Sequence, residues 1–128
     1  MHQPQVNVKI IKLVNGEDVV TVLPTGKNQL PDKSTLLRLE KPLLIKYVPQ
    51  LSPFGIKDYV ALTKWTAYTP DKIITIPKDK IMTITNASIE MSNSYHKLSA
   101  AYDKVPTEVP PSMKLKDELE RLSEDENE

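Results

Sequence analysis

Few side chains in this sequence have the type and spacing that catalysis or metal binding requires. The chain has two histidines, His2 and His96, and no cysteine. Neither histidine stands at metal-ligand spacing from a partner, and without cysteine there is no thiolate nucleophile and no disulfide. Three isolated glycines cannot form a phosphate-binding loop, and no serine occupies a nucleophile-elbow motif. We therefore expect no metal, no cofactor and no covalent catalysis.

Carboxylates are the remaining candidates for acid–base catalysis. Those in the body of the chain are scattered, and catalysis would need two of them brought together in space. Aspartate is common in turns because its side chain bonds to nearby backbone, so we interpret this set as turn residues: Asp32, Glu40, Asp58, Asp71 and Asp79. We predict that the protein is not an enzyme; carboxylates assembled across subunits are the least favoured alternative.

Trp65 is the only tryptophan, and it stands beside Lys64. Together with Tyr47 and Tyr59 it would offer a surface on which bases stack next to a cation, as in proteins that bind single-stranded nucleic acids. A lone tryptophan in a small domain more often packs in the core or at an interface. We favour the core or an interface over base stacking.

The charges are unevenly distributed along a chain that is neutral overall, with 17 basic and 17 acidic residues. Residues 113–128 hold three basic and seven acidic side chains, a net charge of −4, which leaves +4 for the preceding part. An acidic end often only stays hydrated. The mildly basic body is the part that can attract phosphate.

The length of 128 residues suits one domain with one core. No apolar run approaches the roughly 20 residues that a membrane-spanning helix needs. The first residues lack the basic and apolar segments of a secretory signal. We expect a protein of the cytoplasm that contacts no membrane.

The first extended segments form the strongest local pattern. Residues 6–13 carry apolar side chains on both parities, as in a strand that is buried on two faces. Asn15 and Gly16 follow, and we expect them to form a two-residue turn in which both have positive φ. A second strand over residues 19–23 then completes a hairpin.

The next segments continue the strand pattern. Residues 36–48 place four apolar side chains on one parity, Leu37, Leu39, Leu43 and Ile45, and Pro42 among them predicts a bend or an edge. A connection over 49–57 leads to a strand over 59–68, and two short strands, 72–76 and 80–85, flank a tight turn. We count about five short strands, and without a crossover helix they favour a small, strongly bent, five-stranded antiparallel barrel.

The period changes after the last strand. Met91, Tyr95, Leu98 and Tyr102 follow at helical spacing, and Ser88 can cap the helix. We therefore divide the chain into a barrel of residues 1–87, a helix of residues 88–104 packed on it, and an extension of residues 105–128.

The extension combines a proline-rich linker, a short amphipathic helix and the acidic tail. From Ser112 onward, Leu115, Leu119 and Leu122 form an apolar stripe. A helix of about ten residues is marginal alone in water. We expect it to dock on its own body, to contact a neighbouring subunit or partner, or to be partly disordered, in that order; the three leucines are our candidates for an oligomer or partner interface.

The order of these elements resembles the Sm-like fold of the Sm, LSm and bacterial Hfq proteins, over Val6 to Thr85. The first motif of that family corresponds here to residues 32–40, in which Asp32 matches and the asparagine is missing. The second corresponds to residues 76–81, in which the arginine and the glycine are replaced. The family's uridine-binding positions fall on Ser34, Leu36, Pro77 and Lys78. In layout the chain is similar to small Sm-like proteins of marine cyanophages, which implies the host cytoplasm as its location.

This resemblance implies that the protein self-associates into a closed ring through edge strands. The two motif loops would lie near the pore, where the basic side chains of all copies add up and attract phosphate. RNA is thus the partner that we expect, with Lys33, Ser34, Lys78 and Lys80 as candidate binding residues, and an RNA chaperone or regulator of phage origin as the function. The alternative is a phage structural or assembly adaptor that binds protein.

Overall fold

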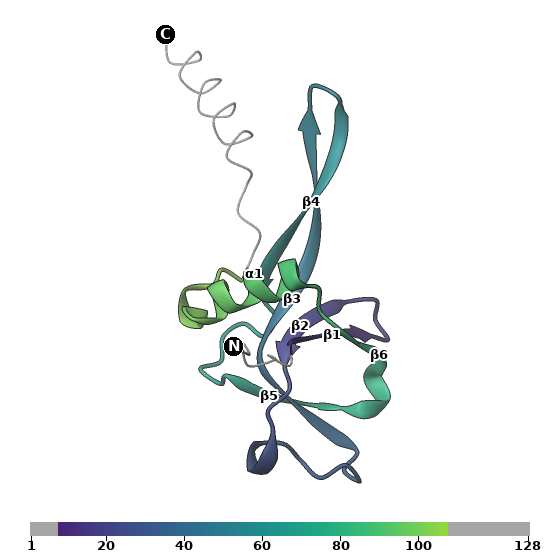
Figure 1. Ribbon diagram of the computed structural model, residues 1–128, viewed down its shortest axis with the longest axis vertical. Helices are drawn as coiled ribbons and strands as arrows, with labels where there is room; N and C mark the ends of the chain where they lie inside the picture. Colours follow the sequence, from purple (N-terminus) through teal and green to yellow (C-terminus); the bar gives the residue numbers. More distant parts are fainter. Residues whose placement is uncertain (1–7, 108–128) are drawn as a thin grey trace, which may run out of the picture.

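The computed structural model describes residues 8–107, which form a bent antiparallel sheet and one α-helix (Figure 1). The elements in chain order are β1 (Val8–Leu13), β2 (Asp18–Val22), η1 (Gly26–Asn28), β3 (Leu36–Ser52), β4 (Gly55–Lys64), β5 (Ile73–Pro77), η2 (Lys78–Lys80), β6 (Ile81–Asn86), α1 (Ile89–Ser99) and η3 (Tyr102–Lys104). The predicted class, a mainly β antiparallel fold with a helix C-terminal to the strands, is confirmed.

The long strand β3 organises the sheet. The strand order is β4-β3-β2-β1-β6, and β5 pairs with β3 outside this path. The first part of β3 pairs with β5, from Leu36 opposite Pro77 to Glu40 opposite Ile73. The second part pairs with β4, from Leu43 opposite Lys64 to Ser52 opposite Gly55. The sheet can curl into a barrel because β3 bends between these two partners.

The N-terminal hairpin is as predicted, but its turn is not. Strands β1 and β2 pair with Lys12 opposite Asp18. Gly16 alone has a positive φ, +91°, so the expectation of two positive-φ residues is wrong. The Gly16 N–H donates to the Leu13 carbonyl at 2.9 Å, and the Asn15 side chain accepts from the Glu17 N–H at 2.9 Å. One left-handed glycine closes a three-residue loop in place of a two-residue turn.

A bulge at Lys41 reverses the faces of β3. Lys41 has φ +46°, and the register with β2 shifts between Val20 and Val22 because β3 contributes one extra residue there. An extra residue turns the following side chains to the opposite face. Leu39 therefore packs inside the barrel, whereas Leu43 packs under the helix. The sequence parity that put these leucines on one face is broken by the bulge at Lys41.

Beyond the barrel, β3 and β4 continue as a projecting two-stranded arm, which we define as residues 46–61 (Figure 1). The predicted connection over 49–57 is wrong, because strand pairing runs through Pro49 opposite Asp58 and leaves only a tight turn at the tip. β2 pairs with β3 only as far as Ile45. A proline is tolerated in the arm because the missing N–H need not serve a third strand.

The expected strand over residues 59–68 ends earlier, at Lys64. Trp65 to Lys72 then leave the sheet, with Tyr68 at φ +66° and fully exposed. The chain rejoins β3 as β5. The six extended segments predicted from the sequence all form strands, so the sheet has six strands where about five were counted.

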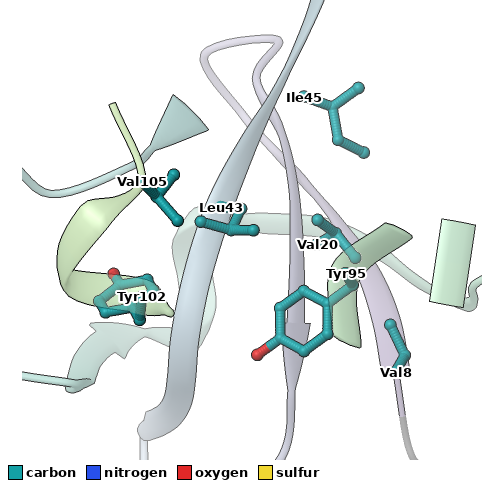
Figure 2. Packing of buried hydrophobic residues seen from close by; sticks show 7 residues of the cluster. All are labelled: Val8, Val20, Leu43, Ile45, Tyr95, Tyr102 and Val105. Atoms are coloured by element: carbon teal, nitrogen blue, oxygen red, sulfur yellow. The ribbon is translucent and has the colours of Figure 1, made fainter. Parts of the chain in front are cut away.

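Two apolar clusters hold the fold together. The first fills the barrel and contains Ile11, Leu13, Val19, Leu37, Leu39 and Ile76. The second lies between the sheet and α1 and contains Val8, Val20, Leu43, Ile45, Tyr95, Tyr102 and Val105 (Figure 2). β1 supplies side chains to both clusters, as expected for a strand with two apolar faces.

Helix α1 begins where the sequence pattern places it. The Ser88 hydroxyl accepts a hydrogen bond from the Met91 N–H at 3.1 Å, which is the predicted cap. Tyr95 is buried and Tyr102 follows it in η3, both facing the sheet. Within residues 8–107, none of the helices has the length and apolar character needed to cross a bilayer.

Candidate nucleic-acid interface

The fold brings two connections together that are far apart in the sequence: residues 31–35, which lead into β3, and η2. The Lys78 N–H donates to the Thr35 carbonyl at 2.8 Å. The Lys78 ammonium also donates to the Asp32 carbonyl at 3.0 Å. Two predicted basic residues thus share one edge, because Lys33 lies in the first connection and Lys78 in the second.

The first connection is held by its own hydrogen bonds. The Ser34 N–H donates to the Pro31 carbonyl at 2.9 Å, and the Ser34 hydroxyl accepts from the Leu36 N–H at 3.1 Å. The N–H and the hydroxyl of Ser34 are therefore both engaged in hydrogen bonds of a local turn. Lys33 is exposed, so its ammonium is the group in this loop that is presented to solvent.

Lys80 joins the same edge to the β1–β2 turn. Its carbonyl accepts from the Val14 N–H at 2.9 Å, and its side chain is exposed. A hollow of about 260 Å³ opens beside it, and its walls include Val14, Trp65, Ile76 and Pro77. We name the exposed edge formed by residues 31–35 and 78–80 the basic rim. Asp32 and Asp79 also lie in it, so its charge is modest in a single chain.

Trp65 lies where the sequence interpretation put it, against the barrel cluster. Its indole N–H donates to a Glu17 carboxylate oxygen at 3.3 Å. One part of the ring nevertheless lines the hollow beside Lys80. Lys64 precedes Trp65 in the sequence, but the lysine that lines the hollow together with Trp65 is Lys80.

Sequence reasoning missed Gln29 and Arg38, which shape the loop before the rim. The Gln29 side chain accepts from the Arg38 N–H at 3.0 Å and donates to the Arg38 carbonyl at 3.1 Å. The Arg38 guanidinium donates to the Asn28 carbonyl at 3.3 Å. No sequence signal predicts these hydrogen bonds between Gln29, Asn28 and Arg38, because they form only when β3 passes beside η1. Arg38 adds one partly exposed guanidinium near the rim.

A second hollow, of about 280 Å³, lies at the C-terminal end of α1 and is less suited to an anion. Three of its lining residues are Lys41, Lys72 and Lys104. The Lys41 ammonium donates to the Ser99 carbonyl at 3.3 Å, and Lys72 lies 4.0 Å from an Asp103 carboxylate oxygen. Two of the three cations are thus already engaged. In the part of the chain that the structure covers, no group of three or more histidines and carboxylates could hold a metal ion.

Among residues 8–107, the arm strand β4 pairs only with β3, and two barrel strands also have one edge without a strand partner: β5 pairs only with β3, and β6 pairs only with β1. Both carry exposed apolar side chains, Ile73 on β5 and Met82 and Ile84 on β6, with exposed fractions of 42%, 61% and 45%. Unpaired edges of this kind can pair with another chain. The predicted interface residues Leu115, Leu119 and Leu122 lie outside the described residues.

The protein is a small antiparallel barrel of the strongly bent class. Its third strand is long and bent, a 3-10 turn precedes its last strand, and two of its loops are adjacent. The sequence profile of the Sm-like domain matches residues 10–96. Because this match covers more than half of the chain, the protein belongs to the Sm-like family. No curated protein matches the chain.

Proposed function

We propose that this protein is a non-catalytic RNA-binding protein that acts as a closed ring, in the role of an RNA chaperone or regulator of phage origin. The observation that supports this proposal is that Lys78 hydrogen-bonds to Thr35 and Asp32, which joins the loop that contains Lys33 to η2. Membership of the Sm-like family, whose members generally bind RNA without catalysis, supports the same function.

A ring would supply the positive charge that a single basic rim lacks. A single rim holds three lysines against Asp32 and Asp79, which is too little charge for firm binding. The open edges of β5 and β6 can pair between subunits and repeat the rim around a centre. Repeated ammonium groups displace condensed counterions from RNA, so affinity should fall steeply with salt.

The hollow beside Lys80 adds a contact of a different kind. A base that enters it would meet the Trp65 ring and the Pro77 side chain next to a cation. Stacking of this sort contributes about 1–3 kcal/mol per base and tolerates any sequence. RNA binding that persists at moderate salt is the expected sign of this contact.

The test is a fluorescence titration of labelled oligouridine and oligoadenosine at two salt concentrations. We expect Lys33→Ala with Lys80→Ala to weaken binding at least about tenfold at low salt and to reduce the salt dependence. Lys97→Ala with Lys104→Ala is the matched control, because it removes two exposed lysines from α1 and η3 and should change affinity less than about twofold. No affinity for either RNA at low salt, or equal losses in both variants, would refute RNA binding.

A phage structural or assembly adaptor is a second candidate function. It is favoured by Phe54, whose side chain is 99% exposed at the tip of the arm, where a protein partner could bury it. Pull-downs from infected cells with and without nuclease separate the two functions. Partners that survive nuclease treatment and are lost with Phe54→Ser support the adaptor.

A further inference from the structure

The arm carries an apolar face that nothing covers among the described residues. Tyr47, Leu51, Ile56 and Val60 are 64%, 75%, 75% and 46% exposed. They share one face, because Tyr47 pairs with Val60 and Leu51 with Ile56 four positions further along each strand. Between the two pairs, the same face also carries Pro49 opposite the exposed Asp58. The same face continues inward to Ile45 and Leu62, which belong to the cluster under α1.

An arm of this kind is unstable without cover. Beyond Ile45 and Leu62 its two strands pair only with each other in the described part of the chain. An isolated two-stranded hairpin is at best marginally stable in water. The arm therefore gains order from any element that buries its apolar face.

The chain leaves the described region at the foot of this face. Val105 is buried in the cluster under α1 with Leu43 and Ile45. The Pro106 carbonyl accepts from the Lys64 N–H at 2.9 Å, and the Lys64 ammonium lies 4.8 Å from the centre of the Tyr102 ring. The described part of the chain therefore ends beside the end of β4, on the side of the sheet that continues into the apolar face.

We propose that the segment of residues 112–122 docks as a helix on the apolar face of its own arm, with Leu115, Leu119 and Leu122 against Tyr47, Leu51, Ile56 and Val60. The lengths agree. Residues 108–111 span about 13 Å when extended, which equals the rise from Lys64 to Val60. A helix of residues 112–122 is about 16 Å long, and Val60 to Ile56 is about 13 Å.

The arm's own chain is the favoured occupant over a second copy. The segment is tethered at the foot of the face by four residues, so its effective concentration there is in the millimolar range for a short linker. Neither element is stable alone, since a helix of about ten residues is as marginal as a lone hairpin. Burial of the two apolar surfaces against each other stabilises both.

Docking also determines where the acidic residues lie. The segment would run from the foot of the arm toward its tip, so residues 124–128 would be carried to the end of the molecule opposite the β2–β3 connection (Figure 1). Their carboxylates would then be held away from the basic rim. This inference does not depend on RNA binding.

The test uses the full chain and paramagnetic relaxation in NMR. Because the chain has no cysteine, Glu124→Cys offers one attachment site for a nitroxide that leaves the leucines intact. We expect the amide signals of residues 47–60 to broaden. The effect should persist when nitroxide-bearing, ¹⁵N-labelled chains are diluted into an excess of unlabelled, unmodified chains.

Two tail variants separate docking from chance proximity. Leu119→Asp should abolish the broadening and speed amide exchange in the arm by at least about tenfold, since one buried leucine is lost. Asp117→Ala, on the opposite face of the predicted helix, should change neither. Ile56→Ser should reproduce Leu119→Asp from the arm side, and unchanged signals of the barrel cluster verify folding. Broadening that disappears on dilution would assign the face to a second copy, and no broadening at all would exclude docking; either result overturns the proposal.

Discussion

Tyr95 links α1 to the bend of β3 through a single buried hydroxyl. The ring is 2% exposed, and its hydroxyl donates to the Glu40 carbonyl at 2.8 Å, one residue before the bulge. Burial raises the pKa of Tyr95 far above its usual range, and the nearby Glu40 carboxylate raises it further. Burial also raises the pKa of Tyr102, whose hydroxyl donates to the Pro42 carbonyl at 3.2 Å. Both tyrosines therefore hold the bend as neutral phenols.

We predict that the fold loses stability in alkali through these phenols. The pKa of Tyr95 is higher in the folded chain than in the unfolded chain, so its contribution is complete below about pH 10 and falls as the pH rises further. Between pH 9 and 11, urea unfolding should show a loss of about 1 kcal/mol from Tyr95. Tyr95→Phe should remove this part of the pH dependence and cost about 1 kcal/mol at pH 7. An identical alkaline decline in Tyr95→Phe would contradict the prediction.

At the scale of elements, the bulge at Lys41 decides which side of β3 meets which core. Its backbone is left-handed, with φ +46°, and its N–H donates to the Lys72 carbonyl at 2.6 Å. A branched side chain is poorly tolerated in this conformation, whereas glycine is not penalised. The bend is therefore fixed by the surrounding contacts against the preference of lysine.

We predict that Lys41→Val is less stable than Lys41→Gly by about 1–2 kcal/mol. The order should reverse at Lys46, because its backbone is extended and glycine weakens a strand by about 0.5–1 kcal/mol. Urea unfolding of the four variants measures both differences. The same order at the two sites would mean that the bulge does not impose the strain.

The elements that sequence patterns predict well are those whose signal is local. The β1–β2 hairpin and the Ser88 cap depend on residues next to each other, and both are found. The reversal of faces after Lys41 was missed because a bulge depends on the pairing with β2 and leaves no periodic mark. The arm was missed because Pro49 and Pro53 indicate a loop, although β3 there has only one partner. For the rim, the two motif positions identified the loops, but Trp65 beside Lys80 required the tertiary fold.

At the scale of the whole molecule, the proposed function depends on assembly. The strands β5 and β6 directly precede and follow η2 in the chain, and η2 carries Lys78 and Lys80. Pairing of their edges between subunits would therefore repeat the rim lysines at the joints of the ring. Affinity for RNA and oligomeric state should then change together.

We predict that light scattering gives a multiple of the 14.5 kDa chain mass for the wild-type protein. Ile73→Lys with Met82→Lys should give single chains, because charges on an edge strand oppose pairing. RNA affinity of this variant should fall at least about 100-fold, and its salt dependence should weaken, since fewer phosphates are contacted at once. Ile89→Lys is the matched control: Ile89 is 80% exposed on α1, so its replacement should leave both mass and affinity unchanged.

Each outcome of this experiment tests a different part of the proposed function. A wild-type protein that stays at 14.5 kDa at high concentration would remove the ring and, with it, the summation of charge that RNA binding requires. Single chains that keep the full RNA affinity would show that one rim and its hollow suffice, so that stacking beside Trp65 outweighs electrostatics. If subunits pair through β5 and β6 and the lysines between these strands bind RNA, the edge variant should lose both its oligomeric mass and its RNA affinity, whereas Ile89→Lys should lose neither.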